Sequence, residues 1–156
     1  MLEVGDKAPD FTAPLDDGSS FKLGKLKGAL VVLYFYPKDD TSGCTSEAKD
    51  FTALASEFAA AGARVIGLSP DSVAQHVKFK AKHGLDVALV ADEDRSIVER
   101  YGVWVEKSMY GRKYMGVERT TFLIDAKGRI ARIWPKVKVP GHAAAVLAAV
   151  LELAKA

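Results

Sequence analysis

Residues 29–47 read ALVVLYFYPKDDTSGCTSE, and this stretch predicts the centre of the fold. The run from Ala29 to Tyr36 is continuously apolar and rich in β-branched and aromatic residues, which is typical of a strand buried on both faces. Pro37 and the polar residues up to Gly43 end the strand. A helix that ends at Gly62 is predicted to follow, because apolar residues then recur at three- and four-residue steps. These residues are Ala48, Phe51, Leu54, Ala55 and Phe58.

The chain then continues to alternate between strand and helix patterns. Strands are predicted at residues 64–69 and 87–91, and helices at residues 72–83 and 96–101. Each of these helices is followed by a glycine, and the first begins with a capping box made by Ser72 and Gln75. Helices between buried strands imply a sheet covered on both faces, and therefore an α/β fold.

Hairpins are predicted at both ends of the sequence. Apolar stretches around Phe11 and Phe21 flank the turn signal at residues 16–18, and TTFLID and RIARIW flank a second turn at residues 126–128. The second hairpin makes the sheet mixed. A final amphipathic helix carries Val146, Leu147, Val150 and Leu151, whereas residues 104–118 are predicted to be a loop with at most a short strand. The whole chain, residues 1–156, is predicted to form one domain.

Composition excludes several classes of function. The 22 basic residues are spread among 20 acidic ones, so nucleic-acid binding is not expected. The longest apolar run is too short to cross a bilayer, and the N-terminus does not resemble a signal peptide. The single cysteine excludes an internal disulfide and favours a reducing, cytoplasmic location.

No cofactor and no metal ion are expected either. The histidines are scattered at positions 76, 83 and 142, without the spacing of metal ligands. The acidic runs are interpreted as solvated turns and as charges at helix starts. These runs are Asp16-Asp17, Asp39-Asp40 and Asp92-Glu93-Asp94.

Cys44 lies where the buried strand has ended and the long helix is beginning. With Thr41 or Ser42 as the N-cap, Cys44 falls in the first helical turn, where unpaired N–H groups and the positive end of the helix dipole face its sulfur. This position favours the thiolate, which is the nucleophilic form of cysteine. The alternative is that Cys44 is simply a small buried apolar residue. The polar, turn-prone approach at residues 39–43 argues against that alternative.

Four strings of the sequence resemble one protein family. The string YPKDDTSGCTSE resembles the active-site signature of peroxiredoxins, Pro-x-x-x-Thr-x-x-Cys, here Pro37, Thr41 and Cys44. Glu47 falls where many members carry a glutamate, and ERTTFLID resembles the segment that bears the family's catalytic arginine, here Arg119. The strings ADEDRSIVERYGVW and FLIDAKG resemble the bacterioferritin comigratory protein, or peroxiredoxin Q, subgroup. The resemblance implies a thioredoxin-like fold, which agrees with the strand and helix order predicted from the residues, and a monomer.

The resemblance also implies roles for these residues in the attack of a thiolate on a peroxide. Thr41 offers its hydroxyl to the peroxide, and the N–H groups of Gly43 and Cys44 contribute dipoles. Arg119 keeps the sulfur ionised and stabilises the departing oxygen.

Two further residues are given supporting roles by the resemblance. Pro37 shields the sulfur, and Glu47 positions Arg119 through an ion pair. Each of these residues also has a plain structural alternative: Thr41 is then only a helix cap, Pro37 only the end of a strand, and Arg119 only a surface charge.

The chain departs from many family members in lacking a resolving cysteine. Lys49 occupies the position five residues after Cys44, and the helix predicted at residues 72–83 contains no cysteine. Oxidised Cys44 is a sulfenic acid that must be reduced again, so we expect an external thiol from a thioredoxin, glutaredoxin or glutathione system. A disulfide between the Cys44 residues of two chains is the alternative. Ser42 is a second departure, since the subgroup usually has proline there.

These observations lead to three functional hypotheses. The first is a peroxidase that reduces hydrogen peroxide and small organic hydroperoxides through Cys44. The second is a redox-responsive sensor or binding protein, in which Cys44 is oxidised without turnover. The third is a single-cysteine thiol–disulfide exchange protein, against which the missing second cysteine of a C-x-x-C pair argues.

Overall fold

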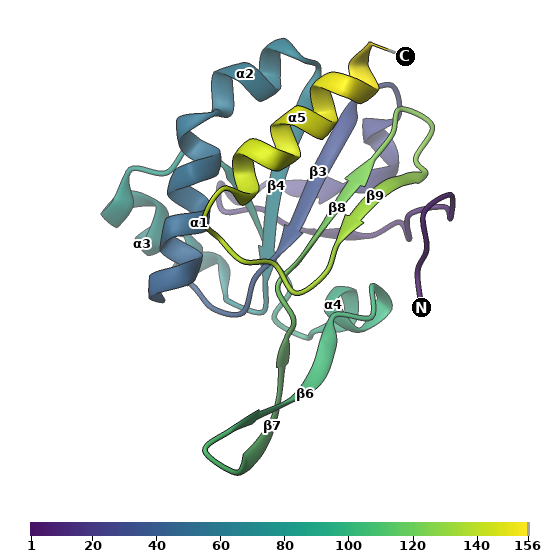
Figure 1. Ribbon diagram of the computed structural model, residues 1–156. Helices are drawn as coiled ribbons and strands as arrows, with labels where there is room; N and C mark the ends of the chain where they lie inside the picture. Colours follow the sequence, from purple (N-terminus) through teal and green to yellow (C-terminus); the bar gives the residue numbers. More distant parts are fainter. Residues whose placement is uncertain (156) are drawn as a thin grey trace.

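The computed structural model describes residues 1–155, and a five-stranded mixed sheet forms its centre (Figure 1). The strand order is β5-β4-β3-β8-β9, in which the first three strands are parallel to one another and β8 is antiparallel to both of its neighbours. The strands are β3 (Leu30–Phe35), β4 (Ala63–Ser69), β5 (Ala88–Ala91), β8 (Thr120–Ile124) and β9 (Ile130–Trp134). This mixed sheet confirms the predicted α/β class.

The central strand β3 is buried on both faces, as its continuous apolar run predicted. Val31, Leu33 and Phe35 belong to the hydrophobic core on one face of the sheet. Val32 and Tyr34 belong to the core on the other face, which also contains Cys44. Side chains alternate between the two faces of a strand, so a strand that packs into two cores has no polar position.

Helices cover both faces of the sheet, but unequally. The face that contains Cys44 is covered by α1 (Ser42–Ala53), α2 (Ala55–Ala60), α3 (Val73–His83) and α5 (His142–Ala154). The opposite face is covered by α4 (Ser96–Arg100), the 3₁₀ helix η1 (Leu23–Leu26) and the N-terminal hairpin of β1 (Thr12–Pro14) and β2 (Ser20–Lys22). The predicted capping box at the start of α3 is present, and Gly84 ends this helix in the left-handed conformation.

Two predictions about local structure were wrong. The helix predicted to run to Gly62 is interrupted at Leu54, where the backbone makes a tight 3₁₀-type turn to the Phe51 carbonyl and α2 begins. Residues 104–118 form a further hairpin rather than a loop, with strands β6 (Trp104–Met109) and β7 (Arg112–Val117).

The β6–β7 hairpin escaped prediction for two reasons. Its strands are largely exposed, so they lack the strict apolar–polar alternation of a half-buried strand. Its turn is made by Tyr110 and Gly111, which both have positive φ, as a type I′ turn requires, but Tyr-Gly is not a usual signal for this turn.

Within residues 1–155, none of the helices has both the length and the apolarity needed to cross a membrane.

Candidate active site

Cys44 is held at the start of α1, which follows the carboxyl end of β3 after the loop of residues 36–41. Thr41 is the N-cap residue, with extended backbone angles, so Cys44 is the third residue of the helix and lies in its first turn. Only 1% of its surface is exposed. The Thr41 side chain makes no capping hydrogen bond with the helix, and its hydroxyl donates to the Lys38 carbonyl oxygen at 2.9 Å. Its oxygen therefore faces other groups as an acceptor.

Arg119 reaches the sulfur from the strand next to β3. It directly precedes β8, whose first residue, Thr120, pairs with Phe35 at the end of β3. The two chain segments therefore meet at the edge of the sheet where α1 begins. The Arg119 Nη2 atom lies 3.3 Å from the Cys44 Sγ atom, within hydrogen-bond distance. The sulfur is buried, yet it faces a guanidinium rather than a wall of aliphatic groups.

Glu47 fixes the other side of the same guanidinium. The Arg119 Nη1 atom donates to Glu47 Oε1 at 2.6 Å, and the Glu47 side chain is almost completely buried. Glu47 lies three residues after Cys44 on α1, so both face the same side of the helix. The planar fork of arginine engages both partners at once, which a lysine ammonium would do less well.

Gly43 leaves the space that the guanidinium occupies. A Cβ atom at this position would lie 3.2 Å from Arg119 Nη2, closer than an ordinary van der Waals contact. Any side chain there would require the guanidinium to shift. Gly43 is therefore brought into the site with Cys44, Glu47 and Arg119, whereas Pro37 is half-buried at the beginning of the preceding loop.

Among residues 1–155, the second carboxylate oxygen of Glu47 is buried without a hydrogen-bond partner, and so is the Tyr34 hydroxyl. Burial raises the pKa of Glu47 from 4.5 to about 7, although the positive charge of Arg119 opposes this rise. Burial, followed by the nearby charge of Glu47, also raises the pKa of Tyr34 well above its ordinary value. Glu47 therefore gains or loses its proton close to neutral pH.

The conformational stability of the protein is expected to depend on pH through Glu47. Because the pKa of this carboxyl is higher in the folded than in the unfolded chain, its contribution to stability is fully present below about 4.5 and is lost as the pH rises through about 7. The difference is on the order of 3 kcal/mol. Urea unfolding of wild type and Glu47→Gln across this pH range measures it. The variant should be less sensitive to pH, and parallel curves would contradict the assignment.

The loop between β3 and α1 is anchored by a buried network that sequence reasoning missed. The His76 Nδ1 atom lies 2.6 Å from Asp39 Oδ2, and its Nε2 atom lies 2.9 Å from the Val90 carbonyl oxygen. The Tyr36 hydroxyl donates to the second Asp39 oxygen, and the Asp39 N–H donates to Asp71. The interpretation of Asp39 as solvated was wrong, because it is buried in this network, whereas Asp40 is exposed.

The charge of His76 follows from the same contacts. Burial alone would lower the pKa of His76, but the hydrogen bond that its ring donates to Asp39 and the negative charge of Asp39 raise it overall. Both ring nitrogens face acceptors, which suits the doubly protonated imidazolium. The ligand atoms of His76, Asp39 and Asp71 lie within 4.8 Å of one another, a grouping that the spacing in the sequence did not indicate. Hydrogen bonds within the protein join all three residues.

His142 is another neighbour of the site that the sequence did not indicate. His142 is the first residue of α5, and its Nε2 atom lies 2.8 Å from the hydroxyl of Thr121 on β8. Burial, with a smaller contribution from the charge of Arg119, lowers the pKa of His142 to about 4. His142 is therefore neutral at pH 7 and adds no second positive charge behind Arg119.

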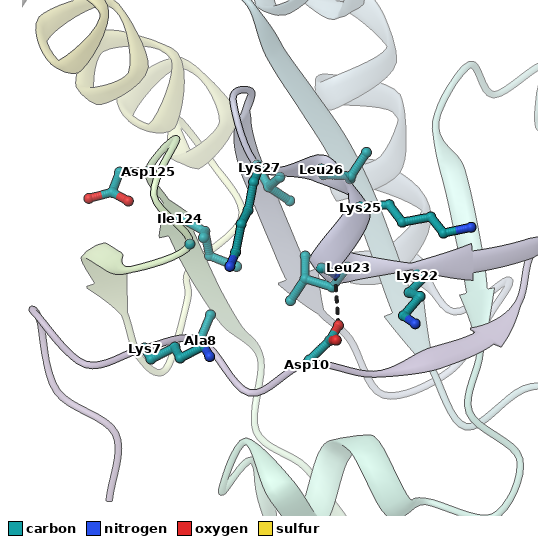
Figure 2. A pocket seen from close by; sticks show the side chains of 13 residues that line it. Lys7, Ala8, Asp10, Lys22, Leu23, Lys25, Leu26, Lys27, Ile124 and Asp125 are labelled. Carbon is teal, nitrogen blue, oxygen red and sulfur yellow. Dashed lines mark hydrogen bonds between the residues drawn. The ribbon is translucent and has the colours of Figure 1, made fainter.

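A cavity of about 300 Å³ lies at the other end of the sheet from Cys44 (Figure 2). It is lined by residues at the beginning of β3 and the end of β8, whereas Cys44 follows the end of β3. Asp10 closes one side of it and accepts a hydrogen bond from the Gly24 N–H at 2.7 Å. None of the candidate site residues lines this cavity. The candidate site itself needs no large hollow if its substrate is small.

Comparisons with known proteins agree with this geometry. A family model described as the AhpC/TSA family matches residues 4–133. The chain is 53% identical to a protein named putative peroxiredoxin bcp of Coxiella burnetii, over 94% of this chain and 97% of that protein. It is 49% identical to peroxiredoxin Bcp of Bacillus subtilis, over 94% and 93% of the two chains. A structure of Xanthomonas campestris peroxiredoxin Q has a TM-score of 0.90 at 45% identity and covers 99% of this chain and 98% of that one. This similarity confirms the predicted thioredoxin-like fold.

Proposed function

Because the chain belongs to the AhpC/TSA family and is a peroxiredoxin of the Bcp, or peroxiredoxin Q, type, an enzyme that reduces hydroperoxides with a thiol, we propose that Cys44 is its peroxide-attacking residue and that an external thiol regenerates it. The substrates are hydrogen peroxide and small organic hydroperoxides. The observation that carries the proposal is the 3.3 Å contact between Cys44 Sγ and an arginine that Glu47 holds in place.

The first step oxidises the sulfur by two electrons. The Cys44 thiolate donates an electron pair to one peroxide oxygen, so that an S–O bond forms while the O–O bond breaks. The other oxygen departs with the bonding pair as hydroxide or alkoxide and takes a proton from water. Cys44 is left as a sulfenic acid.

The side chains around the sulfur stabilise the charge that moves in this step. Arg119 donates to the sulfur in the resting enzyme and to the departing oxygen in the transition state, where its charge counts most. The Thr41 hydroxyl oxygen accepts a hydrogen bond from the peroxide, since its own proton is donated to Lys38. The N–H groups of Gly43 and Cys44 add dipoles at the helix start. Pro37, half-buried at the loop, keeps bulk water away.

Regeneration requires a partner, because the sequence contains one cysteine. A thiol condenses with the sulfenic acid, which releases water and forms a mixed disulfide with Cys44. A second thiolate then attacks the partner's sulfur, which releases the Cys44 thiolate and leaves the partner oxidised as a disulfide. The exposed Lys49 and the cysteine-free helix α3 support this one-cysteine cycle.

A steady-state assay tests the one-cysteine cycle. Peroxide consumption is measured with dithiothreitol, with thioredoxin and its reductase, and with glutaredoxin and glutathione. Turnover with any of these thiols, with a mixed disulfide at Cys44 detected by mass spectrometry, is the expected result. Oxidation of one equivalent per chain without turnover under all three conditions would instead indicate the sensor hypothesis.

We further infer a cytoplasmic location and a monomer. The location is supported by the single free cysteine, which suits a reducing compartment. The monomer is supported by the resemblance to the peroxiredoxin Q subgroup, and sedimentation equilibrium measures it directly.

A further inference from the structure

Exposed apolar side chains are concentrated on the β6–β7 hairpin. Eight large apolar residues are exposed among residues 1–155, and half of them lie on this hairpin and its turn. Tyr110, at the tip, is 99% exposed. Isolated exposed apolar residues are ordinary, but a group of them on one small element indicates an interaction surface. The four residues are Met109, Tyr110, Tyr114 and Met115.

The hairpin stands apart from the central sheet. Its two strands form a separate two-stranded sheet that extends away from the body of the molecule (Figure 1). Residues that pair across an antiparallel hairpin share a face, so Lys107 lies beside Tyr114, and Met109 lies beside Arg112. One face of the hairpin therefore combines an aromatic ring and a methionine with two cations.

This face contains no carboxylate to balance its cations. Glu106 lies on the opposite face, where its carboxylate is 3.7 Å from the Lys113 ammonium. Neither Lys107 nor Arg112 takes part in any salt bridge among residues 1–155. The surface is therefore complementary to a partner that presents apolar groups together with acidic ones.

The base of the same face borders the Cys44 site. The half-buried Lys107 side chain crosses Gly116, where a Cβ atom would lie 3.3 Å from its Cδ atom. The strand β7 then leads through Glu118 directly to Arg119. Burial, and then the positive charge of Arg119, lower the pKa of Lys107, whereas Cys44 opposes this effect. The ammonium of Lys107 therefore shares the electrostatic environment of the sulfur.

We propose that this face of the β6–β7 hairpin, formed by Lys107, Met109, Arg112 and Tyr114 with Tyr110 at its tip, is the docking surface for a protein dithiol that reduces Cys44. The proposal rests on the proposed function, in which an external thiol must reach a sulfur with 1% exposure. A protein that brings its own sulfur to Cys44 has to approach beside Arg119, and so contacts the hairpin. Methionine and tyrosine suit such a transient interface, because they give large contact areas and adapt to the partner.

The test separates docking from chemistry by comparing a protein reductant with a small one. Met109→Ser/Tyr110→Ser removes exposed apolar groups from the far end of the hairpin. Leu151→Ser is the matched control, since Leu151 is 45% exposed on α5. With thioredoxin as the probe, kcat/KM for the reductant is expected to fall about tenfold in the hairpin variant, as for the loss of interface anchors, while dithiothreitol-driven turnover stays unchanged. The control should match wild type in both assays.

The contribution of the positive charges on this face is tested separately at Arg112. Arg112→Glu should raise KM for thioredoxin, and added salt should raise KM in the wild type more than in this variant. Equal losses with thioredoxin and dithiothreitol, or no loss with either, would overturn the proposal. So would a wild-type enzyme that dithiothreitol regenerates but thioredoxin does not, an outcome that leaves the proposed peroxidase function standing. A change from dimer to monomer in the hairpin variant, without a change in reduction, would assign the surface to a second copy of this chain.

Discussion

The Cys44→Ser variant is expected to lose peroxide consumption completely, down to the rate measured without enzyme. Cys44 is the only cysteine, so no second sulfur can take over the attack. A serine hydroxyl at the same position stays protonated at neutral pH and is a poor nucleophile unless a general base activates it. Glu47, a buried carboxylate three residues further along α1, bonds to Arg119 rather than to position 44. Initial rates with hydrogen peroxide and dithiothreitol measure the loss.

The substitution should leave the structure intact. Oxygen is smaller than sulfur, and the serine hydroxyl retains a hydrogen-bonding group for Arg119 Nη2. Unchanged circular dichroism and a similar Tm serve as controls. Residual turnover in a folded Cys44→Ser variant would show that another group attacks the peroxide, and the proposed assignment would then fail.

Much of the fold could be predicted because buried strands and capped helices leave local signals. The continuous apolar run in β3 reflects burial on both faces, and Ser72 with Gln75 reports the start of α3 without any tertiary information. The hairpin of β6 and β7 leaves no such signal, since its side chains are mostly exposed and its turn is a Tyr110-Gly111 pair. The interruption at Leu54 likewise lies within an unbroken helical pattern.

The candidate site was predictable only in part, and for a related reason. Cys44 and Glu47 belong to one helical turn, and the family resemblance added Arg119 from 75 residues away. The anchoring of the loop was not predictable, because His76 on α3 reaches Asp39 in the loop across 37 residues. Only the sheet order, which places β4 beside β3, brings these two side chains together.

The orientation of each buried group around Cys44 depends on its neighbour in the site. Burial alone would favour a neutral Glu47, and Arg119 counteracts this by pairing with its Oε1 atom. Pairing in turn fixes the guanidinium on the side that faces the sulfur. The absence of a side chain at Gly43 leaves room for that orientation. The position of the guanidinium beside the sulfur is therefore set by two separate chain segments, the first turns of α1 and the residue before β8.

Replacing Arg119 by methionine is expected to slow the reaction of Cys44 with peroxide by a factor of about 10² to 10³, the usual loss when one donor to a developing charge is removed. Methionine fills a similar volume but offers neither the Nη2 donor to the sulfur nor a positive charge. Stopped-flow tryptophan fluorescence or competition kinetics measure the step directly. The rate of Arg119→Lys should fall between those of wild type and Arg119→Met, because an ammonium keeps the charge but loses the planar fork that engages both Sγ and Glu47. An unchanged rate in Arg119→Met would remove Arg119 from the mechanism.

A double variant tests whether Glu47 acts through Arg119 or by itself. If Glu47 is a positioning residue, Glu47→Gln slows the reaction in the wild-type background but adds nothing in Arg119→Met, where no guanidinium remains to be held. If Glu47 instead supplies a proton to the departing oxygen, its removal should cost the same factor in both backgrounds. The dependence of the rate on pH would then follow Glu47, whose pKa of about 7 lies within the measurable range. The hydrogen bond of 2.6 Å between Glu47 and Arg119 favours the first outcome, in which the two substitutions are strongly non-additive.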